Sequence, residues 1–379
     1  MLSKPMILPP AMLGMLGGGQ LGRYFVIAAH ELGYKVTVLD PDANSPAGRI
    51  ADVHLCSAYD DAAALASMAE TCAAITTEFE NVPAATLDFL AQTRTVRPSA
   101  SAVAIAQHRV LEKQFVRDAG LPVAPFAVIN TAQDLPADDS GLYPAILKVA
   151  RFGYDGKGQA RVADAAAAAA AFEQFGMQTC VLENMLSLDA EVSVVLARDA
   201  DGHIVTFPVV ENSHLNGILD VSIAPARISD VLKAKAQALA TQLAQKLAYE
   251  GVLAVEFFIS EGKLLVNEMA PRPHNSGHYT IDACVTNQFE QQVRALTGLP
   301  LGDARQHSAA VMVNILGDIW QDGEPAWSKA TAHTALKLHL YGKHEARPGR
   351  KMGHFTTLAA DRDSAHNQAL IARSELGIG

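Results

Sequence analysis

The sequence predicts a mixed α/β and α+β protein, in which a parallel sheet is combined with antiparallel strands. In the first hundred residues, short apolar runs alternate with helix-like segments, which is typical of a parallel sheet covered by helices. The middle of the chain places a glycine-rich loop between two short strands, and the last seventy residues contain strand-like runs separated by glycines. We therefore expect a Rossmann-like parallel-sheet unit, a central mixed unit and a small β-rich C-terminal cap.

The N-terminal elements follow from apolar runs bounded by glycine and proline. Strands are expected at 11–16, 36–39, 53–56 and 73–79, and helices at 21–32 and 62–72. Residues 102–119 read as one helix closed by Gly120 and Pro122.

Further along, strands are expected at 145–149, 159–162, 179–182 and 191–197, helices at 165–175 and 229–249, and a hairpin at 252–269. From about residue 308 we expect short strands with turns at Gly317, Gly342 and Gly349. These elements divide the chain into residues 1–105, residues 106–305 with a subdomain at about 121–185, and residues 306–379.

Composition excludes several classes of function. Of the 379 residues 49% are hydrophobic and 18% are charged, which is typical of a large packed core. The net charge of −10 argues against nucleic acid as a partner. No apolar run is long enough for a membrane span, residues 1–10 lack the pattern of a secretory signal, and the four cysteines are widely spaced. We therefore expect a cytoplasmic protein without nucleic-acid or membrane partners.

The glycine turn near the start has the spacing of a dinucleotide fingerprint. Gly17, Gly19 and Gly22 lie between a strand and a helix, and Asp40 ends the next strand. An NAD(P)-dependent dehydrogenase is therefore one alternative. A second reading is a phosphorylated or polar ligand bound at the helix terminus, and a third is a tight, closely packed turn that needs glycine.

The hairpin carries the strongest chemical indication. A three-residue loop centred on Gly262 would place Glu256 directly across from Glu268, on the same face. Opposed like charges destabilise a sheet, and an unpaired carboxylate inside an apolar run is costly. A bridging Mg²⁺ with oxygen ligands and phosphate would resolve both problems. The alternative is a different register with two surface carboxylates.

Lys148 lies inside an apolar strand, although lysine is seldom buried without a partner. Residues 151–159 follow it, and Gly153, Gly156 and Gly158 leave their amides free to approach an anion. The segment predicts a flap over phosphates; the alternative is a mobile loop with an exposed lysine. Residues 180–186 then read as a strand running into a polar turn, where backbone groups would meet an adenine edge and Glu191 a ribose.

Five segments together resemble the ATP-grasp superfamily and, within it, the 5-(carboxyamino)imidazole ribonucleotide synthetases of purine biosynthesis. They are residues 17–22, 77–82, 152–159, 267–278 and 347–354. The resemblance covers nearly the whole chain and implies an ATP-grasp fold. The implied substrates are ATP, bicarbonate and aminoimidazole ribonucleotide, with Mg²⁺ as the metal. ATP would phosphorylate bicarbonate to carboxyphosphate, and the exocyclic amine of the ribonucleotide would capture its carboxyl carbon.

The same resemblance implies the site residues. ATP would contact Arg109, Lys148, Gly153, Tyr154, Asp155, Gly156, Lys157, Gly158, Gln159, Glu183, Asn184, Met185, Leu186, Glu191, His214, Asn267 and Glu268. The metal would be held by Glu256 and Glu268. The acceptor ribonucleotide would contact Gln20, Glu78, Tyr154, Arg272, His274, Asn275, Lys343 and Arg350. The catalytic set would be Asp155, which handles the amine proton, with Arg272, His274 and Asn275 where carboxyphosphate forms.

A local excess of positive charge agrees with this placement of the acceptor. Residues 337–354 contain five Lys or Arg residues against one acid, Glu345, and Lys343 and Arg350 are the candidate phosphate clamps. The resemblance also implies a homodimer. Formate-dependent glycinamide ribonucleotide transformylase is the alternative within the superfamily, but Tyr154–Asp155 and residues 274–278 favour the imidazole enzymes.

Overall fold

The computed structural model describes residues 6–151 and 158–378, and within them the chain forms three sheets. The first sheet is parallel, with strand order β3-β2-β1-β4-β5. Its strands are β1 (Met12–Leu16), β2 (Lys35–Leu39), β3 (Val53–Leu55), β4 (Ala74–Thr77) and β5 (Thr95–Val96), with helices α1 (Gln20–Glu31), α2 (Ala62–Thr71) and α3 (Ala84–Ala91). The parallel N-terminal sheet expected from the alternating pattern is confirmed.

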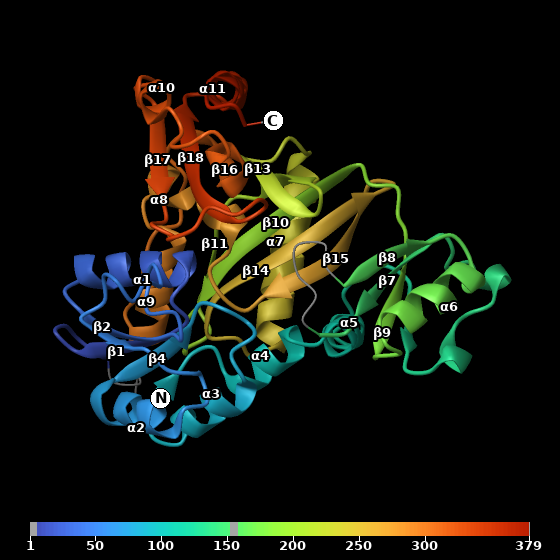
Figure 1. Ribbon diagram of the computed structural model, residues 1–379, viewed down its shortest axis with the longest axis horizontal. Coiled ribbons are helices and arrows are strands. Elements are labelled where there is room, and N and C mark those ends of the chain that lie inside the picture. Colours follow the sequence, from blue (N-terminus) through green and yellow to red (C-terminus); the bar gives the residue numbers. More distant parts are fainter. Residues whose placement is uncertain (1–5, 152–157, 379) are drawn as a thin grey trace.

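A small antiparallel sheet of order β6-β9-β7-β8 forms a subdomain on the right of Figure 1. It consists of β6 (Phe126–Ile129), β7 (Ala145–Val149), β8 (Gln159–Val162), β9 (Cys180–Asn184), the short turns η1 (Ala132–Asp134) and η2 (Asp138–Ser140), and α6 (Ala165–Gln174). Asp164 caps α6 by accepting a hydrogen bond from the Ala167 amide at 2.8 Å. The alanine tract is therefore a packed helix, as expected.

The third sheet has nine strands and connects the central and C-terminal parts of the chain. Its order is β15-β14-β10-β12-β13-β16-β18-β17, with β11 beside β10. The strands are β10 (Ala190–Arg198), β11 (Ile204–Thr206), β12 (Val210–Leu215), β13 (Ile218–Ala224), β14 (Gly251–Ser260), β15 (Lys263–Ala270), β16 (Ala309–Leu316), β17 (Leu336–Leu340) and β18 (Lys351–Ala359). The C-terminal strands thus extend the central sheet through the β13–β16 pair.

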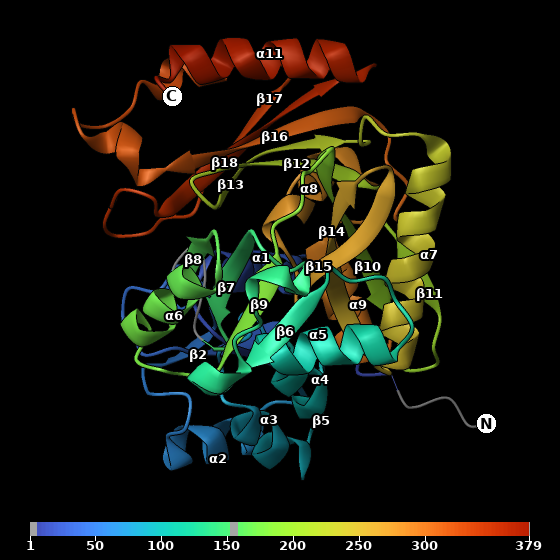
Figure 2. The same ribbon diagram turned by 90° about the vertical axis from the view of Figure 1, so that its right-hand side faces the viewer.

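Helices cover this sheet on several sides. They are α4 (Ala100–Ala106), α5 (Arg109–Asp118), α7 (Asp230–Lys246), α8 (Thr280–Ala283), α9 (Gln288–Thr297), α10 (Trp327–Thr331) and α11 (Arg362–Glu375), with short turns η3 (Asn275–Gly277) and η4 (Gly317–Trp320). Figure 2 shows α11 lying along β16 and β18. No helix within the described residues is long and apolar enough to cross a membrane.

Two expectations about helices were wrong. Residues 102–119 form two helices, because the chain breaks at Gln107, whose side-chain amide donates to the carbonyls of Glu80 and Val82. The break starts α5 at Arg109. The sequence predicts only short strands after residue 308, but this region also contains the 14-residue helix α11. Its buried face is made mainly of alanines, Ala365, Ala369 and Ala372, so its hydrophobic period is weak.

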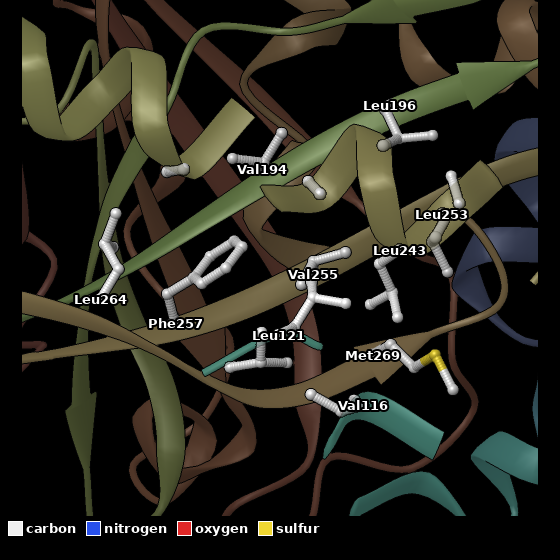
Figure 3. Packing of buried hydrophobic residues seen from close by; sticks show 14 of the residues in the cluster. Val116, Leu121, Val194, Leu196, Leu243, Leu253, Val255, Phe257, Leu264 and Met269 are labelled. Carbon is white, nitrogen blue, oxygen red and sulfur yellow. The ribbon is translucent and has the colours of Figure 1, made fainter. Parts of the chain in front are cut away.

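The largest core lies between the hairpin β14–β15, β10, α5 and α7. Figure 3 shows Leu253, Val255 and Phe257 from one face of β14 meeting Leu243 of α7 and Val194 of β10. Because side chains alternate along a strand, Ala254 and Glu256 belong to the opposite face. The core therefore fixes which face of β14 is left for the functional site.

Candidate active site on the carboxylate hairpin

The hairpin places Glu256 and Glu268 directly opposite each other, as the sequence predicts. The turn, however, has two residues and not three, because Ser260 pairs with Lys263 and both Glu261 and Gly262 have positive φ. A β-bulge at Asn267 supplies the missing residue: Leu264 and Val266 face the core, the bulge intervenes, and Met269 again faces the core. Without the bulge, Glu268 would point into the core, so the bulge directs it towards Glu256.

A third carboxylate, Glu112 of α5, joins this pair. Its side chain accepts a hydrogen bond from the Met269 amide at 2.6 Å. Burial and then the charge of Glu268 raise the pKa of Glu112 to about 8. Burial and the same neighbour also raise the pKa of Glu256. The main cation at this group is Arg109, whose guanidinium lies 3.4 Å from the Glu268 carboxylate. The three carboxylates of Glu112, Glu256 and Glu268 are called the carboxylate cluster below.

Lys148 is paired inside its strand, which explains how a lysine is accommodated there. Its ammonium lies 3.2 Å from one oxygen of Glu183, and that of Lys113 lies 3.0 Å from the other. Burial raises the pKa of the Glu183 carboxyl, but the two ammonium groups outweigh it and lower that pKa to about 2. Burial lowers the pKa of Lys148. The group therefore holds a fixed positive charge beside the sheet.

Glu191 and His214 meet across β10 and β12, with His214 Nδ1 2.9 Å from the Glu191 carboxylate. Burial lowers the pKa of His214, but Glu191, Glu256 and Glu268 raise it overall. At the end of β9, the Asn184 side chain donates to the Leu142 carbonyl at 3.0 Å, and the Met185 amide donates to the Pro144 carbonyl. Leu186 follows in the segment that leaves the sheet, where a strand was expected to run into a polar turn.

The segment after β15 directs three polar residues to the same site. His274 Nε2 lies 3.1 Å from Glu256, and Arg272 pairs with Glu80. Burial, and then the Arg272 charge, lower the pKa of His274 well below its usual value, so the imidazole is neutral. Asn275 is 7% exposed, and both polar atoms of its side chain lack a hydrogen-bond partner. An unpartnered buried amide indicates a position where a ligand group is expected.

The glycine turn is already occupied by the protein's own carboxylates. The Gly18 amide donates to Asp40 at 2.7 Å, and the amides of Gly19 and Gly22 donate to the Glu78 carboxylate. A Cβ atom at Gly19 would lie 2.5 Å from Glu78, so the glycine accommodates this side chain. In a dinucleotide site these amides would face the pyrophosphate. The dehydrogenase alternative is therefore wrong, because the amides on which it depended bind the carboxylate of Glu78.

The C-terminal loop approaches the glycine turn. The Arg49 guanidinium donates to the Gly342 carbonyl at 3.3 Å. The Lys343 ammonium donates to the Lys351 carbonyl at 2.6 Å. Burial raises the pKa of Glu78, although the Gly22 and Gly19 amides and the Lys343 charge oppose part of this rise. Arg350 donates to the Glu345 carbonyl of its own loop. Gln20 directly follows Gly19 and is the first residue of α1.

Several residues assigned to the flap lie outside the described residues: Gly153, Tyr154, Asp155, Gly156 and Lys157. Gly158 and Gln159 are described. The Gly158 carbonyl accepts from the Val149 amide at 2.9 Å, and Gln159 pairs with Lys148 at the start of β8.

Sequence reasoning missed Glu112, Lys113 and Glu80. Glu112 and Lys113 are 3% and 2% exposed although they lie on a helix that is otherwise rich in charge. No local sequence signal marks them, because the helix break that precedes α5 is held by the distant carbonyls of Glu80 and Val82.

A separate group of side chains suited to metal binding is Asp282, His339 and His354. The rings of His339 and His354 stack with centroids 4.5 Å apart and planes 16° apart. A metal ion binds an imidazole nitrogen in the plane of the ring, and two nearly parallel planes do not meet at one ion. The group is therefore interpreted as ring packing between α8 and the C-terminal strands.

Comparisons with known proteins agree with this arrangement. Three family models match: the ribonucleotide synthetase preATP-grasp domain at residues 11–107, the ATP-grasp domain at 114–289 and the phosphoribosylaminoimidazole carboxylase C-terminal domain at 310–368. A curated relative, the N5-carboxyaminoimidazole ribonucleotide synthase of Bacillus subtilis (strain 168), is 43% identical over 366 residues, covering 96% of this chain and 95% of the relative.

Solved structures are similar over the same length. An ADP complex of an N5-carboxyaminoimidazole ribonucleotide synthetase is 41% identical with a TM-score of 0.92, covering 97% of both chains. An N5-carboxyaminoimidazole synthase of Aspergillus clavatus, solved with ADP and 5-aminoimidazole ribonucleotide, is 31% identical with a TM-score of 0.86, covering 97% of this chain and 98% of the other.

Proposed function

The chain belongs to the N5-carboxyaminoimidazole ribonucleotide synthases, a family of ATP-grasp ligases of purine biosynthesis, and from this premise we propose its reaction and site. The protein uses ATP and bicarbonate to carboxylate the exocyclic amine of 5-aminoimidazole ribonucleotide. The products are 5-(carboxyamino)imidazole ribonucleotide, ADP and phosphate.

The observation that carries the proposal is the carboxylate cluster. Three carboxylates converge, with Glu112 buried and Glu256 and Glu268 partly exposed, and burial together with the charge of Glu268 raises the pKa values of Glu112 and Glu256. Such a set of oxygen donors fits Mg²⁺ bound together with nucleotide phosphates. Glu256 and Glu268 are the proposed ligands, with Glu112 and Asn267 beside them. The bound ion would neutralise charge on the transferring phosphoryl group.

ATP is proposed to lie between this cluster and the small sheet. Lys148, Arg109 and the amides of Gly158 and Gln159 would face its phosphates. The adenine and ribose would meet Glu183, Asn184, Met185, Leu186, Glu191 and His214. The fixed charge on Lys148 supports this placement, because its pairing with Glu183 keeps the ammonium in position without a ligand.

The acceptor is proposed to lie between the glycine turn and the segment after β15. Lys343 and Arg350 would hold its phosphate, with Gln20 and Glu78 on the ribose. Arg272, His274 and Asn275 would surround the carboxyl group. The unpartnered amide of Asn275 supports this position, since it has both a donor and an acceptor to offer.

The chemistry divides into two balanced transfers. A bicarbonate oxygen attacks the γ-phosphorus of ATP, the bond to the β-phosphate oxygen breaks, and carboxyphosphate and ADP form. The acceptor nitrogen then attacks the carboxyl carbon, the carbon–oxygen bond to phosphate breaks, and the amine loses a proton. In this scheme the cation of Arg272 stabilises the negative charge of the carboxyphosphate and the side-chain amide of Asn275 orients it, with His274 beside them.

The test is ADP release by the purified chain with MgATP, in buffer freed of carbon dioxide. We expect rapid release only when both bicarbonate and 5-aminoimidazole ribonucleotide are added, with labelled bicarbonate entering the product. Release with formate and glycinamide ribonucleotide in their place would overturn the proposal in favour of the transformylase. We also propose a cytoplasmic homodimer, as the family resemblance implies, which sedimentation of the purified chain tests.

A further inference from the structure

A row of buried polar side chains crosses the large sheet and ends at His274. Its members are Ser222 of β13, Asn212 of β12, Ser193 of β10 and Ser276 of η3. Ser193, Ser222 and Ser276 are 0% exposed and Asn212 is 6% exposed. None of these side chains belongs to the ATP, metal or acceptor contacts proposed above.

The row is continuous in its hydrogen bonds. Ser222 donates to Asn212 Oδ1 at 2.8 Å, and Asn212 Nδ2 donates to Ser193 at 3.0 Å. Ser193 donates to the Ser276 hydroxyl at 2.8 Å, and that hydroxyl lies 2.9 Å from His274 Nδ1. At the far side of the imidazole, Nε2 lies 3.1 Å from Glu256.

Sheet pairing explains why these residues align. Ser193 lies directly opposite Glu256 on the neighbouring strand, and Asn212 lies directly opposite Ser222. The strands are adjacent in the order β14-β10-β12-β13. The row thus runs perpendicular to the strands, on the face of β14 that carries Glu256.

The donors in the row have one consistent direction. An amide nitrogen only donates, so Ser193 accepts from Asn212 and gives its own hydrogen to Ser276. Ser276 then gives its hydrogen to His274 Nδ1. The backbone amide of Ser276 also points at Nδ1, at 3.3 Å, which supports Nδ1 as an acceptor, but the hydroxyl at 2.9 Å is the closer donor. The hydrogen of the imidazole is left on Nε2, facing Glu256.

We propose that Ser193, Asn212 and Ser276 are positioning residues that keep Nδ1 of His274 as a hydrogen-bond acceptor and its hydrogen on Nε2, so that Nε2 donates to Glu256. The inference rests on the proposed function, in which Glu256 holds the metal. A hydrogen bond from His274 to one carboxylate oxygen leaves the other oriented towards the ion.

The first measurement needs no turnover. Nitrogen NMR of the metal-free protein with ¹⁵N-labelled histidine, at a pH high enough for Glu256 to be ionised, reports which imidazole nitrogen is unprotonated, and His274→Gln identifies the signals. We expect the unprotonated signal at Nδ1. A hydrogen on Nδ1 in the unmodified protein would overturn the proposal, whether or not the chain carboxylates the ribonucleotide. Failure of the proposed function would instead appear as absent ADP release with the tautomer unchanged.

Two variants test the row independently. Asn212→Asp replaces the donating amide with an acceptor, so Ser193 turns its hydrogen away from Ser276, and Ser193→Ala removes the link. In both variants we expect the unprotonated signal to be shared between the two nitrogens, and kcat to fall roughly 10- to 100-fold. KM for ATP should change less than about threefold, because no member of the row contacts ATP.

Ser213→Ala is the matched control, because Ser213 is the exposed neighbour of Asn212 on β12. It should leave both the tautomer and kcat unchanged. If Asn212→Asp and Ser193→Ala both kept the tautomer and kcat of the unmodified protein, the row would be structural only and the proposal would be wrong.

Discussion

The glycine turn and the carboxylate cluster both contain buried carboxylates, but only one of them is satisfied by the protein. Glu78 accepts hydrogen bonds from the Gly19 and Gly22 amides at the N-terminus of α1, where the helix dipole also favours a negative charge. At the cluster, Glu112 and Glu256 both lie near the like charge of Glu268. This charge adds to the effect of burial and raises the pKa values of both residues.

The comparison shows why a sequence motif can indicate the wrong ligand. A glycine-rich turn presents amides to an anion, and in this chain the anion is a side chain fifty-nine residues away from Gly19. The cluster has the opposite character, since its carboxylates act on one another as like charges. The place where we propose an external ligand is therefore the cluster, and the proposed ligand is a cation.

The largest expected effect comes from removing one charge of the cluster. Glu268→Gln should cut kcat by roughly 10²–10⁴-fold, because electrostatic stabilisation of a transferring phosphoryl group is a large part of catalysis. The same change removes a like charge, so the metal-free protein should unfold at a higher temperature. Steady-state ADP release and thermal unfolding check the two expectations.

Glu261→Gln is the matched control, because Glu261 is an exposed glutamate at the tip of the same hairpin. It should change neither activity nor stability. Near-normal activity in Glu268→Gln would show that Glu268 is not a metal ligand. The difference drawn between the glycine turn and the carboxylate cluster would then also be wrong.

The second effect concerns the acceptor phosphate. Because the glycine-turn amides are used internally, the phosphate needs side-chain cations, and the Lys343 charge already acts on Glu78. A charge-assisted contact contributes about 1.5–3 kcal/mol, so Lys343→Ala should raise KM for the ribonucleotide roughly 10- to 100-fold. KM for ATP should stay nearly constant. The reverse pattern, measured with each substrate varied in turn, would place the acceptor elsewhere.

The third effect concerns the glycine turn, whose amides would lose their hydrogen-bond acceptor. Glu78→Ala leaves the Gly19 and Gly22 amides without their acceptor, which should destabilise the protein by about 1–3 kcal/mol in phosphate-free buffer. Added inorganic phosphate should restore part of this stability in Glu78→Ala and not in the unmodified protein, because a helix N-terminus binds anions. Urea unfolding with and without phosphate measures both. Equal stability of the two proteins would mean that Glu78 is not needed as a cap.

The sequence predicted those parts of the fold and the site that depend on the local spacing of apolar residues. Alternating segments predicted the parallel sheet, and the positions of Glu256 and Glu268 in two apolar runs predicted their opposition. The opposition arises differently from the expected loop, since a tighter turn is compensated by the bulge at Asn267. A bulge is visible only when both strands are seen against the core, because it changes which face the following residues occupy.

The parts that the sequence did not predict depend on packing between distant elements. Glu112 reaches the site only because α5 starts after the break at Gln107, and that break is held by carbonyls of Glu80 and Val82. Likewise, the row from Ser222 to His274 joins four elements whose residues have no common spacing. No local rule relates such positions before the sheet order is known.

The smallest effect is a dependence of metal binding on pH, which follows from the sign of the raised pKa values. Glu112 has a pKa of about 8 in the folded protein, well above its ordinary value, and that of Glu256 is also raised. Between pH ~4.5 and ~8 the folded metal-free protein therefore binds more protons than the unfolded chain, so its stability falls as pH rises through this window. The proposed Mg²⁺ would bind the ionised carboxylates and oppose this loss.

Magnesium alone, without nucleotide, should therefore raise the unfolding temperature more at pH about 8.5 than at pH about 6, by a few degrees at most for a protein of this size. Glu268→Gln should abolish the difference between the two pH values, whereas Glu261→Gln should retain it, because Glu268 is a proposed metal ligand whose charge acts on Glu112 and Glu256, and Glu261 is neither. Thermal unfolding at matched ionic strength, with potassium chloride replacing magnesium chloride in the reference, separates binding from screening. Equal stabilisation by Mg²⁺ at both pH values, or its persistence in Glu268→Gln, would show that the ion binds away from the cluster.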